Sequence, residues 1–132
     1  MEKEKCINTV QQIYADFGAG NVEGVLNSLT EDISWNDPGS PDIPYAKKRN
    51  GKKEVMNFFM EMGGTVSFTE FAPQEFYADN NAVVVKGFFA GKANGTGKNF
   101  ESEWIMIWKF KGDKVNHYQA FVDTQKMINA IK

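Results

Sequence analysis

Phe100–Val115, with the sequence FESEWIMIWKFKGDKV, carries the clearest secondary-structure pattern in the chain. Residues 100–110 alternate with a period of two, the pattern of a β-strand with one better-buried face. The buried face would consist of Phe100, Ser102, Trp104, Met106, Trp108 and Phe110. Gly112 and Asp113 then signal a turn. The stretch predicts a strand, a tight turn and a second strand over 114–122.

Two further strands are expected before this hairpin, at 66–78 and 82–93. Turn signals separate them, at residues 79–81 (DNN) and 94–97 (NGTG). Parallel neighbours need long crossover connections, so strands joined by turns this short must pair antiparallel. The second half of the chain therefore predicts a largely antiparallel sheet.

The first half of the chain reads as helices around one strand. Apolar residues recur at helical spacing over 5–18, and Asn21 can cap a second, short helix. A strand-like alternation follows at 33–37, then an irregular loop over 38–51 with three of the four prolines. A third helix is expected over 52–62, ended by Gly63 and Gly64 in the left-handed region. Residues 124–131 close the chain as one or two helical turns.

These elements predict an α+β fold whose N-terminal helices cover one face of the sheet. The chain has 132 residues with no internal repeat, low-complexity tract or linker, so we expect one domain over 1–132. The outer face of the central strand carries Ile105 and Ile107 between charged residues. A half-apolar outer face of this kind indicates a covering partner, and a second copy of the chain is the economical one.

Composition excludes several classes of function. The formal net charge of −2 offers no basic field for nucleic acid, and no run of about 18 apolar residues could span a membrane. The basic run KKRNGKK at 47–53 is short enough to be a solvated loop. The charged N-terminus lacks the apolar core of a signal peptide, and Cys6 has no second cysteine to pair with. We expect a cytoplasmic domain without cofactor, nucleic-acid or membrane partner.

Asp37, in ISWNDPGS at 33–40, is the leading candidate for chemistry. Asp-Pro-Gly-Ser is a good β-turn sequence, which gives Asp37 a purely structural interpretation. Strand parity gives the other one: if Trp35 faces the interior, Asp37 does too. Desolvation beside apolar walls raises the pKa of a carboxyl, which makes it a better base near neutral pH.

Three other residues could assist Asp37. His117 is the only histidine, so a metal site with two or three histidines is excluded. Alternation alone does not decide whether His117 or Tyr118 faces the interior. Tyr14 lies on the apolar side of the first helix, where Ile13 competes with it. Tyr45 in the proline-rich loop could close over a ligand.

The order of elements and four stretches together resemble a known family. The stretches are YADFGAGNVEGVLNSLTEDISWNDPG (14–39), GSPDIPYAKKRNGKKEVMNFF (39–59), FESEWIMIWKFKGDKV (100–115) and HYQAFVDT (117–124). The chain resembles the nuclear transport factor 2-like superfamily, and within it the SnoaL-like proteins related to ketosteroid isomerase. The resemblance implies a cone-shaped α+β barrel: a strongly curved sheet wrapped around three N-terminal helices, with an apolar pocket. It also implies dimerisation through the outer face of the sheet.

The resemblance carries over to the site only in part. The isomerase base falls on Asp37, the isomerase tyrosine on Ile13 beside Tyr14, and the isomerase oxyanion aspartic acid on Met106. In ketosteroid isomerase the protonated aspartic acid donates a hydrogen bond to the oxyanion, and methionine cannot donate one.

Two functions therefore stay open. One is acid–base isomerase, cyclase or hydratase chemistry by Asp37 with Tyr14, Tyr45 or His117. The other is non-catalytic binding of a small apolar or aromatic molecule, or an interaction module with a vestigial pocket. The residues expected to line the pocket are Trp35, Tyr45, Phe59, Trp104, Met106 and Tyr118.

Overall fold

A computed structural model describes residues 2–132. The elements in chain order are α1 (Lys3–Gly18), α2 (Val22–Asn27), β1 (Leu29–Asn36), β2 (Lys48–Asn50), α3 (Lys52–Thr65), β3 (Val66–Ala78), β4 (Ala82–Ala93), β5 (Asn99–Lys111), β6 (Lys114–Val122) and α4 (Thr124–Ile131). The α+β class is confirmed, and the four strands of the second half lie where the alternation predicts them.

All six strands form one sheet in the order β2-β1-β6-β5-β4-β3. Strands β3 to β6 pair antiparallel with their neighbours, as expected from the short turns. Strand β1 pairs parallel with β6, because the long segment between them lets the chain return in the same direction. The sheet is therefore mixed.

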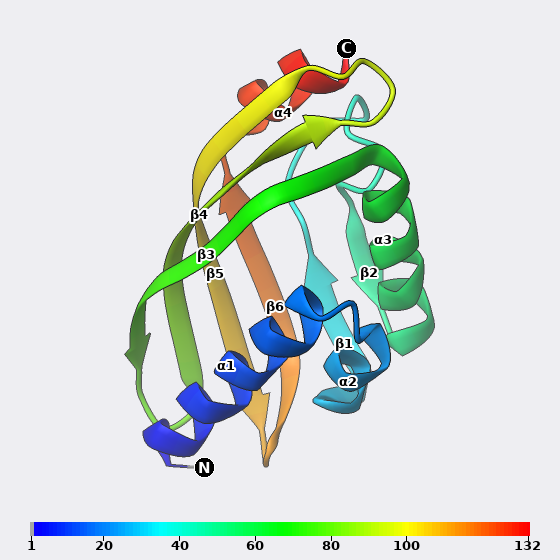
Figure 1. Ribbon diagram of the computed structural model, residues 1–132. Helices are drawn as coiled ribbons and strands as arrows, with labels where there is room; N and C mark the ends of the chain where they lie inside the picture. The colour runs from blue at the N-terminus through cyan, green and yellow to red at the C-terminus, as the bar shows by residue number, and fades with distance from the viewer. Residues whose placement is uncertain (1) are drawn as a thin grey trace.

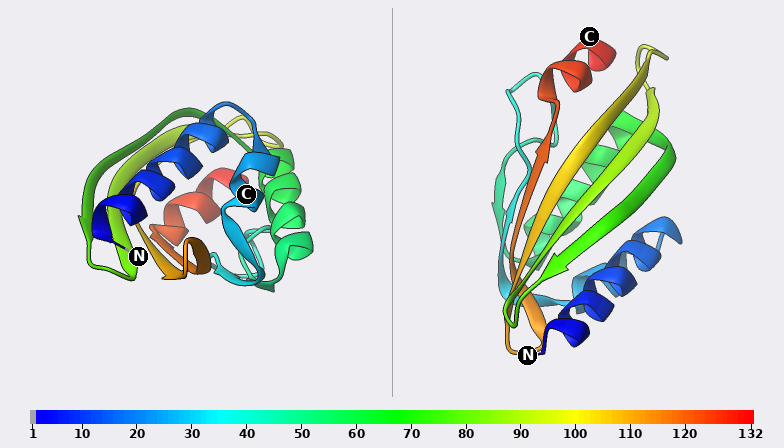
Figure 2. Two further views of the ribbon diagram at one scale, coloured as in Figure 1. Left: turned by 90° about the horizontal axis from the view of Figure 1, so that it is seen from below. Right: turned by 90° about the vertical axis from the view of Figure 1, so that its left-hand side faces the viewer.

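The sheet curves strongly around the N-terminal helices. Seen from below, it forms an open arc with α1 lying across the concave side and α3 beside β1 and β2 (Figure 2). Helix α4 lies at the opposite end of the molecule from the start of α1 (Figure 1). This is the cone-shaped arrangement that the resemblance implied.

Local chemistry explains the helix boundaries near the N-terminus. Gly20, in the link between α1 and α2, has a φ of 75°. Glycine adopts this left-handed conformation without strain, so the chain can turn there after α1. The Asn21 side chain then accepts a hydrogen bond from the Gly24 backbone N–H at 3.0 Å, which caps α2. The predicted Asn21 cap is confirmed.

The predicted end of the third helix is wrong. Helix α3 continues through Gly63 and Gly64 to Thr65, and neither glycine has a positive φ. The Thr65 hydroxyl donates to the Glu61 carbonyl at 2.8 Å inside the last turn. Strand β3 begins at the next residue, so no left-handed cap intervenes.

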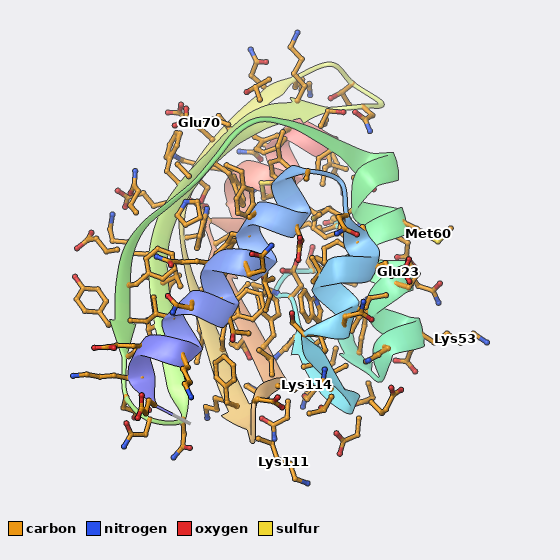
Figure 3. The ribbon with its side chains drawn as sticks, turned by 60° about the horizontal axis from the view of Figure 1, so that its bottom comes forward. Glu23, Lys53, Met60, Glu70, Lys111 and Lys114 are labelled. Carbon is orange, nitrogen blue, oxygen red and sulfur yellow. The ribbon has the colours of Figure 1, made fainter. Side chains whose placement is uncertain are left out.

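The loop predicted over 38–51 also needs correction, because it contains β2. This strand pairs antiparallel with β1, with Arg49 opposite Trp35. Arg49 is only 4% exposed, so the basic run at 47–53 is not a fully solvated loop. Figure 3 shows Lys53 and Met60 directed away from α3, and this outer side is the one that solvent reaches.

The core lies between the concave face of the sheet and the helices. All six residues assigned to the inner face of β5 are buried, which confirms the alternation there. Gly87 of β4 lies against the Trp104 ring, and a Cβ at this position would overlap that ring. A glycine here lets the large indole lie flat on the sheet.

No helix among residues 2–132 has both the length and the apolar character needed to cross a membrane.

Candidate functional site

A cavity of about 60 Å³ lies between the concave face of the sheet, α1 and α3. Its walls are mostly aromatic and aliphatic, and Asp37 is the only charged residue among those that line it. Seven of the residues predicted from sequence line it: Tyr14, Trp35, Asp37, Tyr45, Phe59, Met106 and Tyr118. An apolar cavity with a few convergent polar groups is typical of a small-molecule site.

Asp37 follows β1 directly and faces the cavity together with Trp35, as strand parity predicts. The Asp37 backbone N–H donates to the Lys47 carbonyl at 3.4 Å, which extends the pairing of β1 with β2 by one step. The predicted turn over 37–40 is wrong. The first turn hydrogen bond runs from the Ile43 N–H to the Ser40 carbonyl, at 3.0 Å.

Gly39 explains how the chain leaves the cavity after Asp37. Its φ is +148°, and a Cβ there would lie 2.8 Å from the Ala46 Cβ and 2.9 Å from the Ile43 Cδ1. The Pro-Gly pair therefore allows a close approach between the two arms of the loop instead of forming a tight turn.

The Asp37 carboxyl sits in an environment that disfavours its charge. Part of the residue's surface stays accessible, but burial of the carboxyl raises its pKa to about 7. The positive charge of Arg49 limits this rise. Among residues 2–132 no side chain forms a hydrogen bond or ion pair with the carboxyl. Such a group can exchange protons near neutral pH.

Two tyrosine hydroxyls share this end of the cavity with Asp37. Tyr118 is 3% exposed and stacks on Trp35 with ring centroids 3.9 Å apart. Tyr45 is 6% exposed and packs edge-on against Phe58. Burial first, and then the negative charge of Asp37, raise the pKa of both phenols. Both therefore stay protonated and able to donate.

Tyr14 of α1 lines the cavity beside Met106. Its hydroxyl donates to the Met106 Sδ at 3.2 Å and accepts from the Trp108 Nε1–H at 3.0 Å. Burial raises the Tyr14 pKa, and the Trp108 hydrogen bond opposes the rise. Counting along the chain placed the isomerase tyrosine at Ile13. In the structure it is the Tyr14 hydroxyl that contacts Met106, the residue at the position of the isomerase oxyanion aspartic acid.

The structure does not bring His117 or Trp104 to the cavity wall. Strand β6 carries a register shift opposite Lys109 and Phe110, so both Val115 and Tyr118 are buried. His117 pairs with Ser34 on one side and with the exposed Lys109 on the other. Burial and the charges of Lys109 and Lys48 lower its pKa. Trp104 is buried under Tyr14, with ring centroids 5.8 Å apart.

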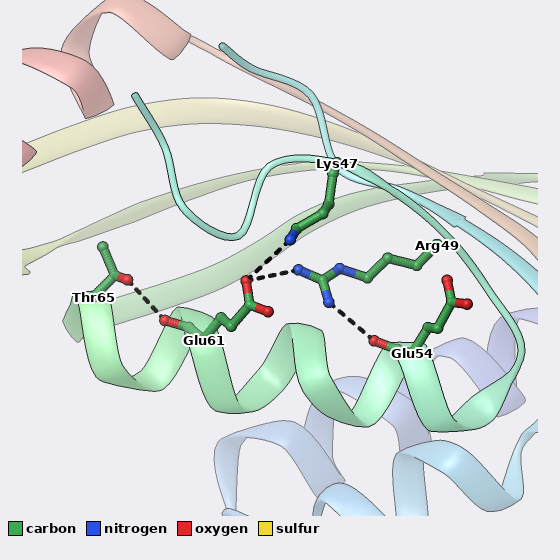
Figure 4. Close-up of polar contacts among 5 residues, drawn as sticks. All are labelled: Lys47, Arg49, Glu54, Glu61 and Thr65. Atoms are coloured by element: carbon green, nitrogen blue, oxygen red, sulfur yellow. Dashed lines mark hydrogen bonds and ion pairs between the residues drawn. The ribbon is translucent and has the colours of Figure 1, made fainter. Parts of the chain in front are cut away.

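Sequence reasoning missed the Arg49 cluster behind the site (Figure 4). The Arg49 Nη2 forms an ion pair with Glu61 at 3.0 Å, and Nη1 donates to the Glu54 carbonyl at 3.2 Å. The guanidinium lies 5.8 Å from the centre of the Phe58 ring. The only available signal was an arginine within a run of four lysines at 47–53, which does not distinguish a buried cation from solvated ones.

Residues 2–132 contain no group of three or more His, Cys, Asp or Glu side chains arranged to hold a metal ion.

Comparison with known proteins identifies the family to which this chain belongs. The sequence profile of the SnoaL-like domain matches residues 10–118. The chain belongs to the SnoaL-like family. This family lies in the nuclear transport factor 2-like superfamily, so the resemblance to the SnoaL-like proteins and to that superfamily is confirmed. No curated protein matches the chain.

Solved structures agree with this SnoaL-like assignment. A nuclear transport factor 2-like protein from Burkholderia xenovorans is 26% identical, with a TM-score of 0.91 over 100% of this chain and 99% of that one. One from Burkholderia pseudomallei, of unknown function, is 25% identical, with a TM-score of 0.90 over 97% and 98%. A Xanthomonas campestris protein provisionally described as a polyketide cyclase is 13% identical and has a TM-score of 0.79 over 100% of both chains. This last likeness shows the fold alone.

Proposed function

We propose that this SnoaL-like protein binds a small apolar or aromatic carbonyl compound in its cavity and that Asp37 moves a proton beside the carbonyl group. The reaction class is isomerisation, cyclisation or hydration. One observation carries the proposal: the single charged side chain that lines this aromatic cavity is a carboxyl that has no partner among residues 2–132 and a pKa of about 7. A general base with a pKa near the working pH transfers protons most effectively.

Cavity size restricts how a substrate enters. An engineered apolar cavity of about 150 Å³ accommodates benzene, and the cavity here is about 60 Å³. A ring compound must therefore displace part of the lining. Three lining residues are methionines, Met62, Met106 and Met127, whose unbranched side chains change conformation readily.

A proton-exchange assay on simple ketones tests the proposal and does not require the natural substrate. A panel of small cyclic and aryl ketones is incubated with the protein in D₂O, and deuterium at the carbon beside the carbonyl is followed by NMR. We expect Asp37→Asn to slow exchange by about 10²-fold or more. The rate for the unmodified protein should rise with pH through about 7, as Asp37 ionises.

His117→Asn is the matched control, because it removes a second ionisable group that lies outside the cavity wall. Its exchange rate should stay within about twofold of the unmodified protein, in the range of neutral surface substitutions. Exchange that survives Asp37→Asn at an unchanged rate, or no exchange above buffer on any ketone, contradicts the proposed chemistry.

A non-catalytic binding function is the second candidate, and one observation favours it. At position 106, where the isomerase branch has a carboxylic acid, the Tyr14 hydroxyl meets a thioether sulfur. Sulfur is a weak acceptor and no donor, so this part of the isomerase machinery is missing. Tight ketone binding without any exchange would support this candidate.

We also propose that the outer face of the sheet joins two copies of the chain. Ile105 pairs with Phe121 across β5 and β6, and Phe121 is 51% exposed. Tyr77, on the same face of β3, is 59% exposed. Analytical ultracentrifugation should show a dimer, and Phe121→Asp should shift it to monomer, because a desolvated charge opposes burial of the face. A monomeric unmodified protein at micromolar concentration would rule this interface out.

A further inference from the structure

The cavity contains three tyrosine hydroxyls in two different situations. The Tyr14 hydroxyl uses its proton on Met106 and accepts the Trp108 N–H, so protein groups occupy both its donor and one acceptor site. The hydroxyls of Tyr45 and Tyr118 form no hydrogen bond with any side chain or backbone group of residues 2–132. Neither hydroxyl is among the fully enclosed side-chain atoms of residues 2–132 that lack a partner, so both reach free space in the cavity and can donate to a ligand there.

Both open hydroxyls flank Asp37 through the pairing of the strands. Tyr118 of β6 is paired with Trp35, two residues before Asp37 on the neighbouring strand β1. Tyr45 lies two residues before Lys47, whose carbonyl accepts the Asp37 backbone N–H. The backbones of the two tyrosines therefore lie on opposite sides of β1, and both phenols are close enough to feel the charge of Asp37.

Packing holds both rings in place. Tyr118 stacks on Trp35 at a centroid distance of 3.9 Å and packs at a tilt against Trp108 at 4.6 Å. Tyr45 is fixed edge-on against Phe58 at 6.0 Å. Donors held rigidly in a water-poor cavity stabilise a developing negative charge more strongly than the same groups in water.

We infer that Tyr45 and Tyr118 are the hydrogen-bond donors that hold the substrate oxygen during proton transfer, in place of the pair at positions 14 and 106. This inference rests on the proposed function. It assigns the groups that stabilise negative charge on the substrate oxygen while Asp37 moves the proton. The ligand class is a carbonyl compound whose oxygen lies at the Asp37 end of the cavity, with its apolar body toward Tyr14 and Met106.

The step balances with these groups alone. The Asp37 carboxylate takes the proton from the carbon beside the carbonyl, and the C–H electron pair becomes a C=C bond. The C=O π pair moves onto oxygen, and the two phenol O–H groups hydrogen-bond to the resulting enolate. The protonated Asp37 then returns its proton to a carbon of the same molecule, and the carbonyl re-forms.

The test uses 4-nitrophenolate, a flat ring with an anionic oxygen whose visible absorption shifts on binding. Binding is measured to the Asp37→Asn protein, because the neutral amide removes repulsion between the ionised carboxylate and the probe. We expect Tyr45→Phe and Tyr118→Phe, each added to Asp37→Asn, to raise the Kd about tenfold. Tyr14→Phe in the same background should change it less than about threefold, since its hydroxyl is already engaged.

Thermal unfolding separates these effects from loss of structure. Removing an unpartnered hydroxyl should leave the unfolding temperature of Tyr45→Phe and Tyr118→Phe unchanged or higher. Tyr14→Phe should lower it, because the Trp108 N–H loses its acceptor. A lower unfolding temperature for both Tyr45→Phe and Tyr118→Phe would show that their hydroxyls bond within the protein, and would overturn the inference.

The inference and the proposed function fail in different ways. The inference is overturned if the Asp37→Asn protein does not bind the phenolate, or if Tyr14→Phe weakens binding most. It is also overturned if ketone exchange depends on Asp37 but is unaffected by Tyr45→Phe and Tyr118→Phe. Phenolate binding that depends on both tyrosines, in a protein that exchanges no ketone proton, supports the donor assignment and removes only the catalytic proposal.

Discussion

Asp37, which directly follows β1, and Arg49, on the neighbouring edge strand β2, both place an ionisable group in the interior. Their surroundings differ. Arg49 meets Glu61 at 3.0 Å and the Glu54 carbonyl at 3.2 Å, and of the three guanidinium nitrogens only Nε has no partner among residues 2–132. The Asp37 carboxyl meets no donor from residues 2–132. One charge is matched within the fold, and the other is left facing a cavity.

This difference indicates separate roles for the two residues. A partnered buried charge fixes how the elements that carry it pack, here β2 against α3. An unpartnered one lowers stability and persists where it serves a ligand or a reaction. Arg49 also acts on Asp37 at a distance, since its charge keeps the carboxyl pKa from rising further.

Arg49→Met should have the larger effect on stability. It removes the Glu61 ion pair, the Glu54 hydrogen bond and the contact with Phe58, and we expect a loss of about 3 kcal/mol in the free energy of unfolding. Urea unfolding measures this. The same substitution should raise the Asp37 pKa above about 7, because the opposing charge is gone.

Arg49→Lys is the matched control for the charge. The lysine keeps the positive charge but cannot engage both acceptors, so stability should fall while the Asp37 pKa changes little. Carboxyl ¹³C NMR reports that pKa. If Arg49→Met leaves the Asp37 pKa unchanged, the two sites are electrostatically independent.

Asp37→Asn should have a smaller effect, of the opposite sign. The folded protein keeps the Asp37 proton up to about pH 7, whereas the unfolded chain releases it near its ordinary value of 3.8. Stability of the unmodified protein therefore falls as pH rises through that window and is level above it. The asparagine protein lacks this fall and should be more stable above pH 7 by about 2 kcal/mol, allowing for partial exposure.

Urea unfolding of both proteins at pH 4.5 and pH 8 tests this sign. The two stabilities should be close at the lower pH and diverge at the higher one. If the asparagine protein is less stable at pH 8, then the carboxylate is held by favourable contacts and is a structural group.

Local sequence patterns determined most of the fold. The period-two alternation over 100–110 identified the inner face of β5 correctly at every position, since side chains of an extended strand must point to opposite sides. Short turns predicted the antiparallel pairing of β3 to β6. Parity from Trp35 also placed Asp37 toward the cavity, although the turn expected after it does not form.

Tertiary structure alone decided how the site is completed. The register shift in β6 breaks the alternation, so Tyr118 faces inward with Val115 while His117 pairs with Ser34 and Lys109. Arg49 is buried because α3 brings Glu61 to it, a contact between residues that no local period relates. Sequence periodicity reports which side of its own element a residue occupies. Which groups from other elements meet it there depends on register and packing, and these decide whether a polar group is matched by the protein or left for a ligand.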